Sequence, residues 1–224
     1  MLCFSANYPR FGLAGRIGLI MDTLNTSELD DIPRISNDST DTTVAFGGYL
    51  FIEQRVAGSS DSRKQKFLGL KAGYDKHTNA AIDATQKDAS GVNSIKVYSD
   101  SWADSKSAIL YYKMKNNDFS WYFGGGVTFY EVGWKNTQWI DYKDPSKNEK
   151  APDISKTGTI PTLAVGIEYN IGKNFAVEAE GDINLGSSSL DNNLIVVKSG
   201  SNTTDIYRGL SWFNLKLAVK YYIF

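Results

Sequence analysis

Charged residues recur at every second position in several apolar segments of the chain. In "FAVEAEGDINL", Glu178, Glu180 and Asp182 alternate with apolar or glycine residues, and in "LKLAVKYYIF" Lys216 and Lys220 lie four residues apart, on one face of the same alternation. Side chains at alternate positions of a strand share one face of the sheet. Acidic and basic side chains on one enclosed face would form ion pairs, because an unpaired buried charge is costly.

The same alternation identifies a larger set of charged residues on one face. The set has five basic and four acidic members: Arg16, Lys71, Lys113, Lys216, Lys220, Glu168, Glu178, Glu180 and Asp182. Hairpin pairing would bring Lys216 opposite Glu180 and Glu168 beside Glu178, and closure of the sheet would set Arg16 next to the last strand. We therefore expect a salt-bridge network inside a barrel. A solvated outer face is the alternative interpretation.

Residues that could support catalysis or metal binding are scarce. The chain has one histidine, His77, and one cysteine, Cys3. A His-based or Cys-rich metal site is therefore not expected. His77 with nearby Asp75 and a loop serine is the one conceivable catalytic arrangement, but a nucleophile needs a positioned base and an orienting partner. We expect no enzyme activity and no cofactor.

Period-2 patterning divides the chain into eight segments, and helical periodicity is nearly absent. The segments span residues 11–23, 42–55, 65–76, 106–116, 119–132, 160–171, 174–185 and 210–223. Their lengths exceed the roughly 5–6 residues of soluble strands and meet the roughly 9–11 that a tilted strand needs to cross a bilayer. No window has the roughly 18 consecutive apolar residues of a membrane helix.

The connections between these segments alternate between long and short. Residues 24–41, 77–105, 133–159 and 186–209 form the long connections, and 56–64, 117–118 and 172–173 form the short ones. This rhythm predicts an all-β protein, an eight-stranded antiparallel up-and-down transmembrane β-barrel with short periplasmic turns and four long extracellular loops. Residues 1–10 would be an N-terminal periplasmic segment and residues 11–224 a single barrel domain.

The direction in which each face points is a separate question. The polar face is rich in glycine and alanine, which suits a cramped interior, and its charges nearly balance. With Tyr49, Phe51, Phe67, Tyr111, Tyr122 and Tyr130 also pointing inward, the lumen of an eight-stranded barrel would be filled and no general porin channel is expected. A soluble lipocalin-like ligand-binding barrel, with its apolar face inside, is the alternative fold.

Three stretches carry a resemblance to a known group of proteins. "SWYFGGGVTFYEVG", "PTLAVGIEYNIGKN" and "FAVEAEGDINLG" resemble strands of the small eight-stranded bacterial outer-membrane proteins, namely the OmpA-barrel, OmpX and opacity-protein group. The resemblance implies the bacterial outer membrane as location, with an export signal removed. It also implies that Tyr222 and Phe224 belong to a signal read by the barrel-assembly machinery, and that lipids and lipopolysaccharide surround the barrel.

Function is expected to lie in the long connections. The formal net charge of −1 gives no reason to expect nucleic acid. Trp102, Trp134, Trp139 and Tyr142 lie among mixed charges, a composition suited to contact with a host or extracellular protein or glycan; solvated, variable loops with aromatic residues extending the hairpins are the alternative. We expect a monomeric, non-enzymatic surface protein with a structural, adhesion or host-interaction role. Narrow-channel or lateral-gate transport of small solutes is the second hypothesis.

Overall fold

The computed structural model describes residues 8–27, 39–59, 63–78, 80–87, 90–186, 195–199, 202–209 and 213–223. Its elements are strands and one short 3-10 helix. Within the described residues, no helix is long and apolar enough to cross a membrane. Phe224, one of the two expected assembly-signal residues, lies outside the described part of the chain.

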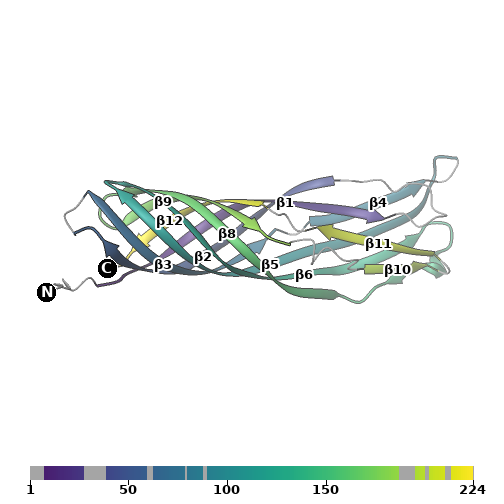
Figure 1. The fold of residues 1–224 in the computed structure, drawn as a ribbon. Helices are drawn as coiled ribbons and strands as arrows, with labels where there is room; N and C mark the ends of the chain where they lie inside the picture. Colours follow the sequence, from purple (N-terminus) through teal and green to yellow (C-terminus); the bar gives the residue numbers. More distant parts are fainter. Residues whose placement is uncertain are drawn as a thin grey trace.

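Eight strands form a closed antiparallel ring (Figure 1). They are β1 (Arg10–Ser27), β2 (Ser39–Ala57), β3 (Lys64–His77), β5 (Asn93–Asn116), β6 (Phe119–Asp141), β8 (Ile154–Ile171), β9 (Phe175–Asn184) and β12 (Phe213–Tyr222). Each strand pairs with the next in this order, and β12 pairs with β1 to close the ring. The predicted eight-stranded up-and-down barrel is confirmed.

Three short turns join the strands at one end of the ring, which we call the turn end. The 117–118 turn has Asn117 at φ 55°, and the turn between β8 and β9 has Gly172 at φ 74°. Asparagine and glycine tolerate this left-handed conformation better than other residues. Between β2 and β3, Gly58 has a φ of 86° and follows a β-bulge. The three turns lie where the sequence predicts them.

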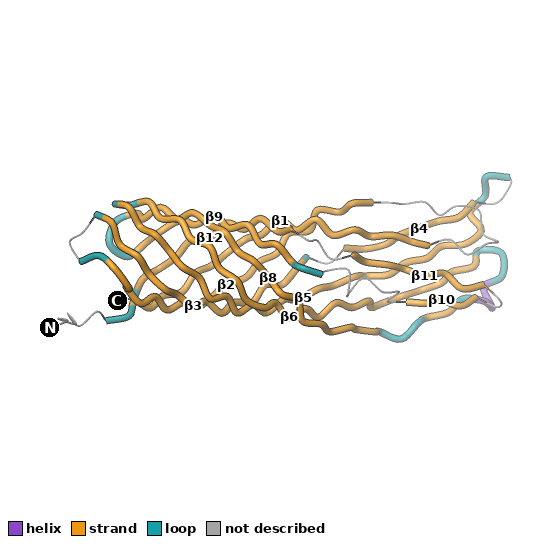
Figure 2. Tube along the Cα trace, viewed as in Figure 1, coloured by secondary structure: helices purple, strands orange, loops and turns teal. Residues whose placement is uncertain are grey.

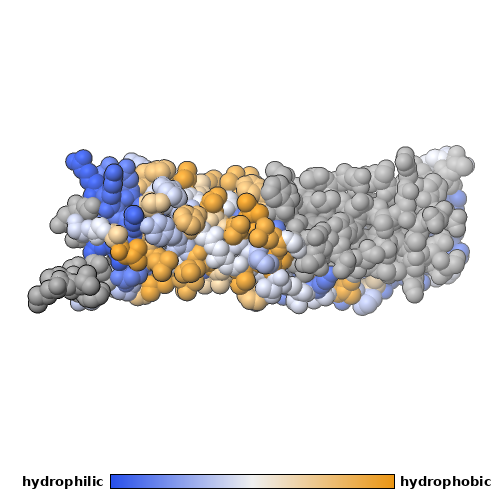
Figure 3. Space-filling model, viewed as in Figure 1, coloured by the Kyte–Doolittle hydropathy of each residue, from blue (hydrophilic) through white to orange (hydrophobic). Residues whose placement is uncertain are grey.

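Apolar side chains cover the outside of the ring, and polar side chains fill its inside. Leu50 is 67% exposed and Leu217 is 57% exposed, whereas Lys113 is fully buried. On the face that Figure 3 shows, an apolar band covers the half of the ring next to the turn end, with a hydrophilic rim at that end. A soluble ligand-binding barrel would have the opposite arrangement, so that alternative is wrong. The aromatic residues expected inside are all buried: Tyr49, Phe51, Phe67, Tyr111, Tyr122 and Tyr130.

The strands continue well beyond the half of the ring next to the turn end (Figure 2). β5 has 24 residues and β6 has 23. Around them lie β4 (Ala80–Lys87), β7 (Glu149–Lys150), β10 (Ile195–Ser199), β11 (Asn202–Gly209) and the 3-10 helix η1 (Pro145–Lys147). We call these elements, together with residues 93–105 of β5 and 130–141 of β6, the extension.

The extension corrects the expected loop boundaries. Residues 77–105 and 133–159 were expected to be loops, but most of them pair as strands. The expected connections 24–41 and 186–209 also contain strand residues. Backbone ladder pairing needs no apolar face, and a register shift between Tyr98 and Asp100 breaks the alternation within β5. Polar composition and the broken period together hide these strands in the sequence.

Candidate functional site

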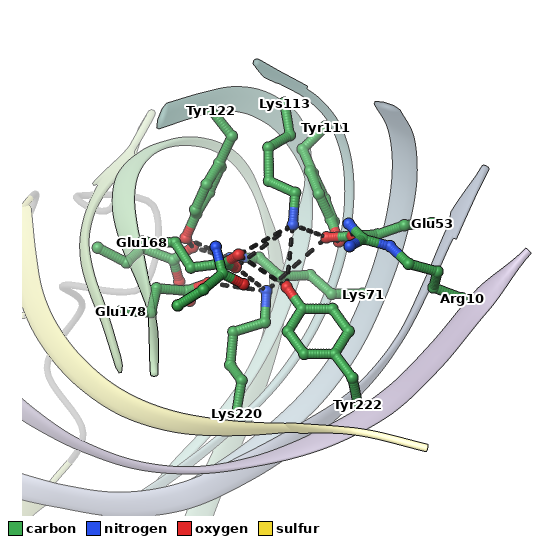
Figure 4. A network of polar contacts seen from close by, with 12 residues as sticks. Arg10, Glu53, Lys71, Tyr111, Lys113, Tyr122, Glu168, Glu178, Lys220 and Tyr222 are labelled. Atoms are coloured by element: carbon green, nitrogen blue, oxygen red, sulfur yellow. Dashed lines mark hydrogen bonds and ion pairs between the residues drawn. The ribbon is translucent and has the colours of Figure 1, made fainter. Parts of the chain in front are cut away.

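Charged side chains from almost every ring strand meet inside the barrel (Figure 4). β1, β2, β3, β5, β8, β9 and β12 contribute them, and β6 contributes tyrosines. Six residues are basic and six are acidic: Arg10, Arg16, Lys71, Lys113, Lys216, Lys220, Glu53, Asp75, Glu168, Glu178, Glu180 and Asp182. Arg10 is half-buried, and the other eleven are buried. We call these twelve residues the interior network.

The half of the network nearer the turn end centres on Glu168. Lys220 Nζ lies 2.7 Å from Glu168 Oε2, and Lys113 Nζ lies 3.2 Å from Oε1. Lys220 also lies 3.1 Å from Glu178. Lys113 contacts Glu53, which in turn pairs with Arg10 at the edge of the barrel. The pairs therefore form one connected group rather than separate bridges.

The other half of the network begins with Arg16. Its guanidinium donates to both oxygens of Asp75, with Nε–Oδ1 at 2.6 Å and Nη2–Oδ2 at 2.7 Å. Such a two-pronged pair is among the stronger hydrogen-bonded arrangements in proteins. Lys216 lies 2.5 Å from Asp182 and 3.3 Å from Asp75, and Lys71 contacts Glu180. Arg16 Nη1 at 3.8 Å from Glu180 joins these pairs to one another.

Tyrosine hydroxyls supply further donors to the buried carboxylates. Tyr49 donates to Glu178 at 2.7 Å, Tyr111 to Glu53 at 2.8 Å, Tyr122 to Glu180 at 2.5 Å and Tyr222 to Glu168 at 2.7 Å. A buried ion pair becomes tolerable only when additional hydrogen bonds satisfy its remaining lone pairs. Tyr222, expected as part of the assembly signal, thus has its side chain inside the barrel.

The nine charged residues selected from the sequence all lie in this interior. The register places Lys216 directly opposite Glu180 and Glu168 directly opposite Glu178. Glu178 takes its lysine contact from Lys220, which lies diagonally across from it on the neighbouring strand β12.

Three members of the network were missed by the sequence reasoning: Arg10, Glu53 and Asp75. Glu53 lies in phase with inward-facing Tyr49 and Phe51 of β2, and Asp75 lies in phase with Lys71 of β3. Strict alternation would therefore have found both. Arg10 lies one residue before the first predicted segment.

The catalytic arrangement considered for His77 is not available at the surface. His77 is buried, with its ring 6.2 Å from that of Tyr130 in an edge-on contact. Asp75 is engaged by Arg16 and Lys216 instead. In the part of the chain that the structure describes, no group of three or more His, Cys, Asp or Glu side chains could hold a metal ion.

The four aromatic residues expected to contact partners lie in different environments. Trp134 and Trp139 have exposed fractions of 0% and 1%. The expectation that these two contact a partner is therefore corrected, since both are enclosed within the extension. Trp102 is half-buried and pairs across the sheet with Gly133, where an added Cβ would overlap the Trp102 ring. Tyr142 is 48% exposed, next to η1.

A closed eight-stranded ring, an apolar outer band and a charged lumen define a membrane barrel. The sequence profile of the OmpA-like transmembrane domain family matches residues 21–183 of the chain. The chain belongs to this family. The OmpA-like protein is therefore a bacterial outer-membrane β-barrel, its turn end periplasmic and its extension extracellular. No curated protein shows a significant match to its sequence.

Solved structures of outer-membrane proteins also align with the OmpA-like barrel. OprG of Pseudomonas aeruginosa aligns over 97% of each chain, with a TM-score of 0.46 and 11% identity. Ail of Yersinia pestis, in complex with the heparin analogue sucrose octasulfate, covers 96% of this chain and 99% of its own, with a TM-score of 0.45 and 11% identity. Neisserial surface protein A has a TM-score of 0.43 and 10% identity, covering 94% of this chain and 96% of its own.

Large buried side chains fill the interior of this OmpA-like barrel. Lys113 and Lys220 rank among its largest fully buried side chains, together with Glu53 and Glu168. An eight-stranded barrel is just wide enough for side chains to fill it. The network therefore occupies the lumen, and the surfaces left for interaction are the lipid-facing band and the extracellular extension.

Proposed function

We propose that this OmpA-like protein is a non-enzymatic surface protein that contacts extracellular proteins or glycans through its extension, in adhesion or host interaction. The observation that carries the proposal is the length of β5 and β6, whose 24 and 23 residues reach past the apolar band. A barrel that served only as a membrane plug would need strands of roughly 9–11 residues. The additional length raises an ordered β-structure above the membrane.

The β5–β6 hairpin is held in a defined shape by side-chain contacts. Asn136 donates its amide to Asp100 at 2.8 Å, and the Tyr98 hydroxyl donates to the same carboxylate at 2.5 Å. These hydrogen bonds to the ionised form lower the pKa of Asp100 below its ordinary value. They lie beside the register shift in β5, where the ladder itself is interrupted. Side-chain hydrogen bonds therefore support the extension where its backbone ladder is interrupted.

The tip of the extension, residues 141–150 of the hairpin that β6 forms with β7, is ordered as well. Asp141 Oδ1 accepts from the backbone N–H groups of Lys143 at 2.8 Å and Asp144 at 2.9 Å. Asn148 Oδ1 accepts from the Asp141 N–H at 2.8 Å, and η1 lies between them. Exposed Tyr142 stands on this tip among exposed lysines. A preordered aromatic and charged surface loses little conformational entropy on binding.

The proposal is tested by removing the tip while keeping the barrel. Replacing residues 142–146 with Asn-Gly would close the hairpin with a tight turn, because Asn-Gly is the preferred two-residue hairpin loop. Bacteria displaying either chain would be measured for binding to immobilised extracellular-matrix proteins and to a glycan array. We expect binding by the unaltered chain and its loss in the shortened chain.

The control is a substitution on the membrane part, Val177→Leu, which should leave binding unchanged because it alters only a lipid-facing side chain. Equal surface display is verified with antibody against an engineered tag, and folding by the electrophoretic shift on boiling. Cells that display the folded chain yet bind no better than cells without it would overturn the proposal.

We further propose that β12 carries the signal for the barrel-assembly machinery, as the resemblance of the last strand implies. β12 closes the ring by pairing with β9 and β1, so the barrel is complete only when this strand has paired with both neighbours. Phe224→Ala should slow assembly in cells while refolding from urea into detergent stays normal. Equal slowing in both settings would indicate a stability effect instead and contradict an assembly signal.

A further inference from the structure

Charged side chains of both signs lie on one outer face of the ring, where the lipid-facing band meets the extension. Asp104 of β5 pairs across the sheet with Glu131 of β6, and both line a hollow of about 690 Å³. Lys106, two residues from Asp104 along β5, lines the same hollow. Directly opposed like charges destabilise a sheet unless other groups share them. This face therefore favours an additional cation beside its two carboxylates.

The lysine on this face does not neutralise those carboxylates within its own chain. Lys106 and Glu131 are both exposed, and neither takes part in a salt bridge among the described residues. Across the sheet, Lys106 lies beside Tyr74 and Phe129 instead. A cation and a carboxylate that are exposed but separate in one chain can each pair with the opposite charge on another molecule.

An apolar groove continues from this hollow into the lipid-facing band. It has a volume of about 660 Å³, and small residues lie along it: Gly48, Ala72 and Ala108. Leu50 and Phe129 line the same groove as large, exposed side chains. In membranes, small residues at an interface let two backbones approach closely. The face therefore has both a recess and large side chains that could fill the recess of a second copy.

The charges of this face are complementary to those of the same face on another copy. All copies have the same orientation in the membrane, so a two-fold axis that relates two of them must run perpendicular to the membrane. Equal residues of the two copies then lie at equal depth. Lys106 and Asp104 are two residues apart along β5, about 7 Å of strand, a distance that a lysine side chain can bridge. Each lysine can therefore reach the carboxylates of the opposite copy.

We propose that this face joins two copies of the chain into a homodimer in the outer membrane, with Lys106 of each copy beside Asp104 and Glu131 of the other. Leu50 and Phe129 of one copy fill the groove over Ala108 of the other. The dimer takes the place of the monomer expected from the sequence. It involves neither the interior network nor the tip of the extension, so it does not depend on the proposed role in adhesion.

The test measures association of the whole protein in lipid vesicles. Copies are labelled in urea with a donor or an acceptor dye at Cys3, the only cysteine of the chain, and are then folded together into the vesicles. Energy transfer between them is followed as the protein is diluted with lipid, which gives the dissociation constant of the dimer. Each protein is first shown to be folded by its electrophoretic shift on boiling.

The variants address the two parts of the interface separately. Lys106→Glu and Glu131→Lys reverse one charge each and are also combined, and Ala108→Leu fills the groove. The matched controls lie elsewhere on the outer surface. They are Lys66→Glu, at an exposed lysine of β3 near the turn end, and Ala179→Leu, in a hollow over β8 and β9.

We expect each single charge reversal to raise the dissociation constant about tenfold, because it replaces attraction between the copies by repulsion. The combined variant should return to within about threefold of the unaltered chain, since exchanging the two charges restores the pairs. Ala108→Leu should also weaken association, and both controls should leave it unchanged.

Two outcomes would overturn the proposal, even if Ala108→Leu failed to fold. Energy transfer no higher than that of randomly mixed proteins, for the unaltered chain at every dilution, would mean that lipid covers this face. A combined variant that associates as weakly as the single reversals would mean that the two charges do not meet between copies.

Discussion

At the scale of single residues, the stability of the barrel interior depends on mutual satisfaction of charges. Glu168 has three partners in the turn-end half, since it accepts from Lys113, Lys220 and Tyr222. Removing one partner of a buried ion pair leaves the others uncompensated, which costs far more than the pair itself contributes. The network is therefore weak evidence for net stabilisation but a strong constraint on substitution.

Glu168→Gln should lower the free energy of unfolding by about 3 kcal/mol, because it leaves two buried lysines with too little negative charge. The measurement is urea-induced unfolding from lipid vesicles, followed by tryptophan fluorescence. Glu149→Gln, at an exposed position of β7, should change the unfolding free energy by less than about 0.5 kcal/mol. A Glu168→Gln loss as small as that of the control would show that the lysines are satisfied without this carboxylate.

At the scale of the strand, inward glycines make room for tyrosine rings from the neighbouring strand. Gly166 of β8 lies opposite Tyr122 of β6, and a Cβ added at Gly166 would overlap the Tyr122 ring. The ring cannot move freely, because its hydroxyl donates to Glu180. Glycine here is required by the close approach of the ring, and its backbone conformation is ordinary.

Gly166→Ala should therefore cost about 1–3 kcal/mol of unfolding free energy, the usual range for overpacking. Gly15→Ala is the matched comparison, because a Cβ at this outward position of β1 meets nothing within 4 Å. Unfolding of both variants from the same vesicles would separate steric conflict from the general effect of replacing glycine. Equal losses in the two would contradict the packing role of Gly166.

The strands also show how far sequence reasoning reaches. Alternation was sufficient for the ring, because a strand between lipid and a charged lumen must keep strict period 2, as β9 and β12 do. Beyond the apolar band, no lipid faces the strands, and the sequence is not constrained to alternate between apolar and polar residues. For this reason the sequence predicts loops for the outer halves of β5 and β6. Trp134 and Trp139 were accordingly placed at the surface, although both are enclosed. The ion pairs inside the network also include diagonal ones, such as Lys220 with Glu178 on the neighbouring strand. The strand register gives only the directly opposite residues, so it does not predict these pairs.

At the scale of the whole molecule, closure is the property that distinguishes this barrel from an open sheet. β12 pairs with β1 from Tyr222 with Gly12 to Asn214 with Ile20, so the apolar band surrounds the ring without an edge. We expect the unboiled protein to migrate as a compact band that shifts on boiling, and a single unshifted band would contradict a closed, detergent-stable barrel.

Closure and a filled lumen together lead to a prediction about conduction. Arg16, Lys71 and Lys216 approach carboxylates from different strands across the same cross-section of the ring, which leaves side chains rather than water along the axis. In a planar bilayer, the purified protein should give no steady ion conductance above that of the lipid alone, at neutral pH and moderate salt. A porin reconstituted in the same way serves as the positive control. Stable conductance steps from the unaltered chain would mean that the network opens without substitution, and the transport hypothesis would then replace that of a filled barrel acting through its extension.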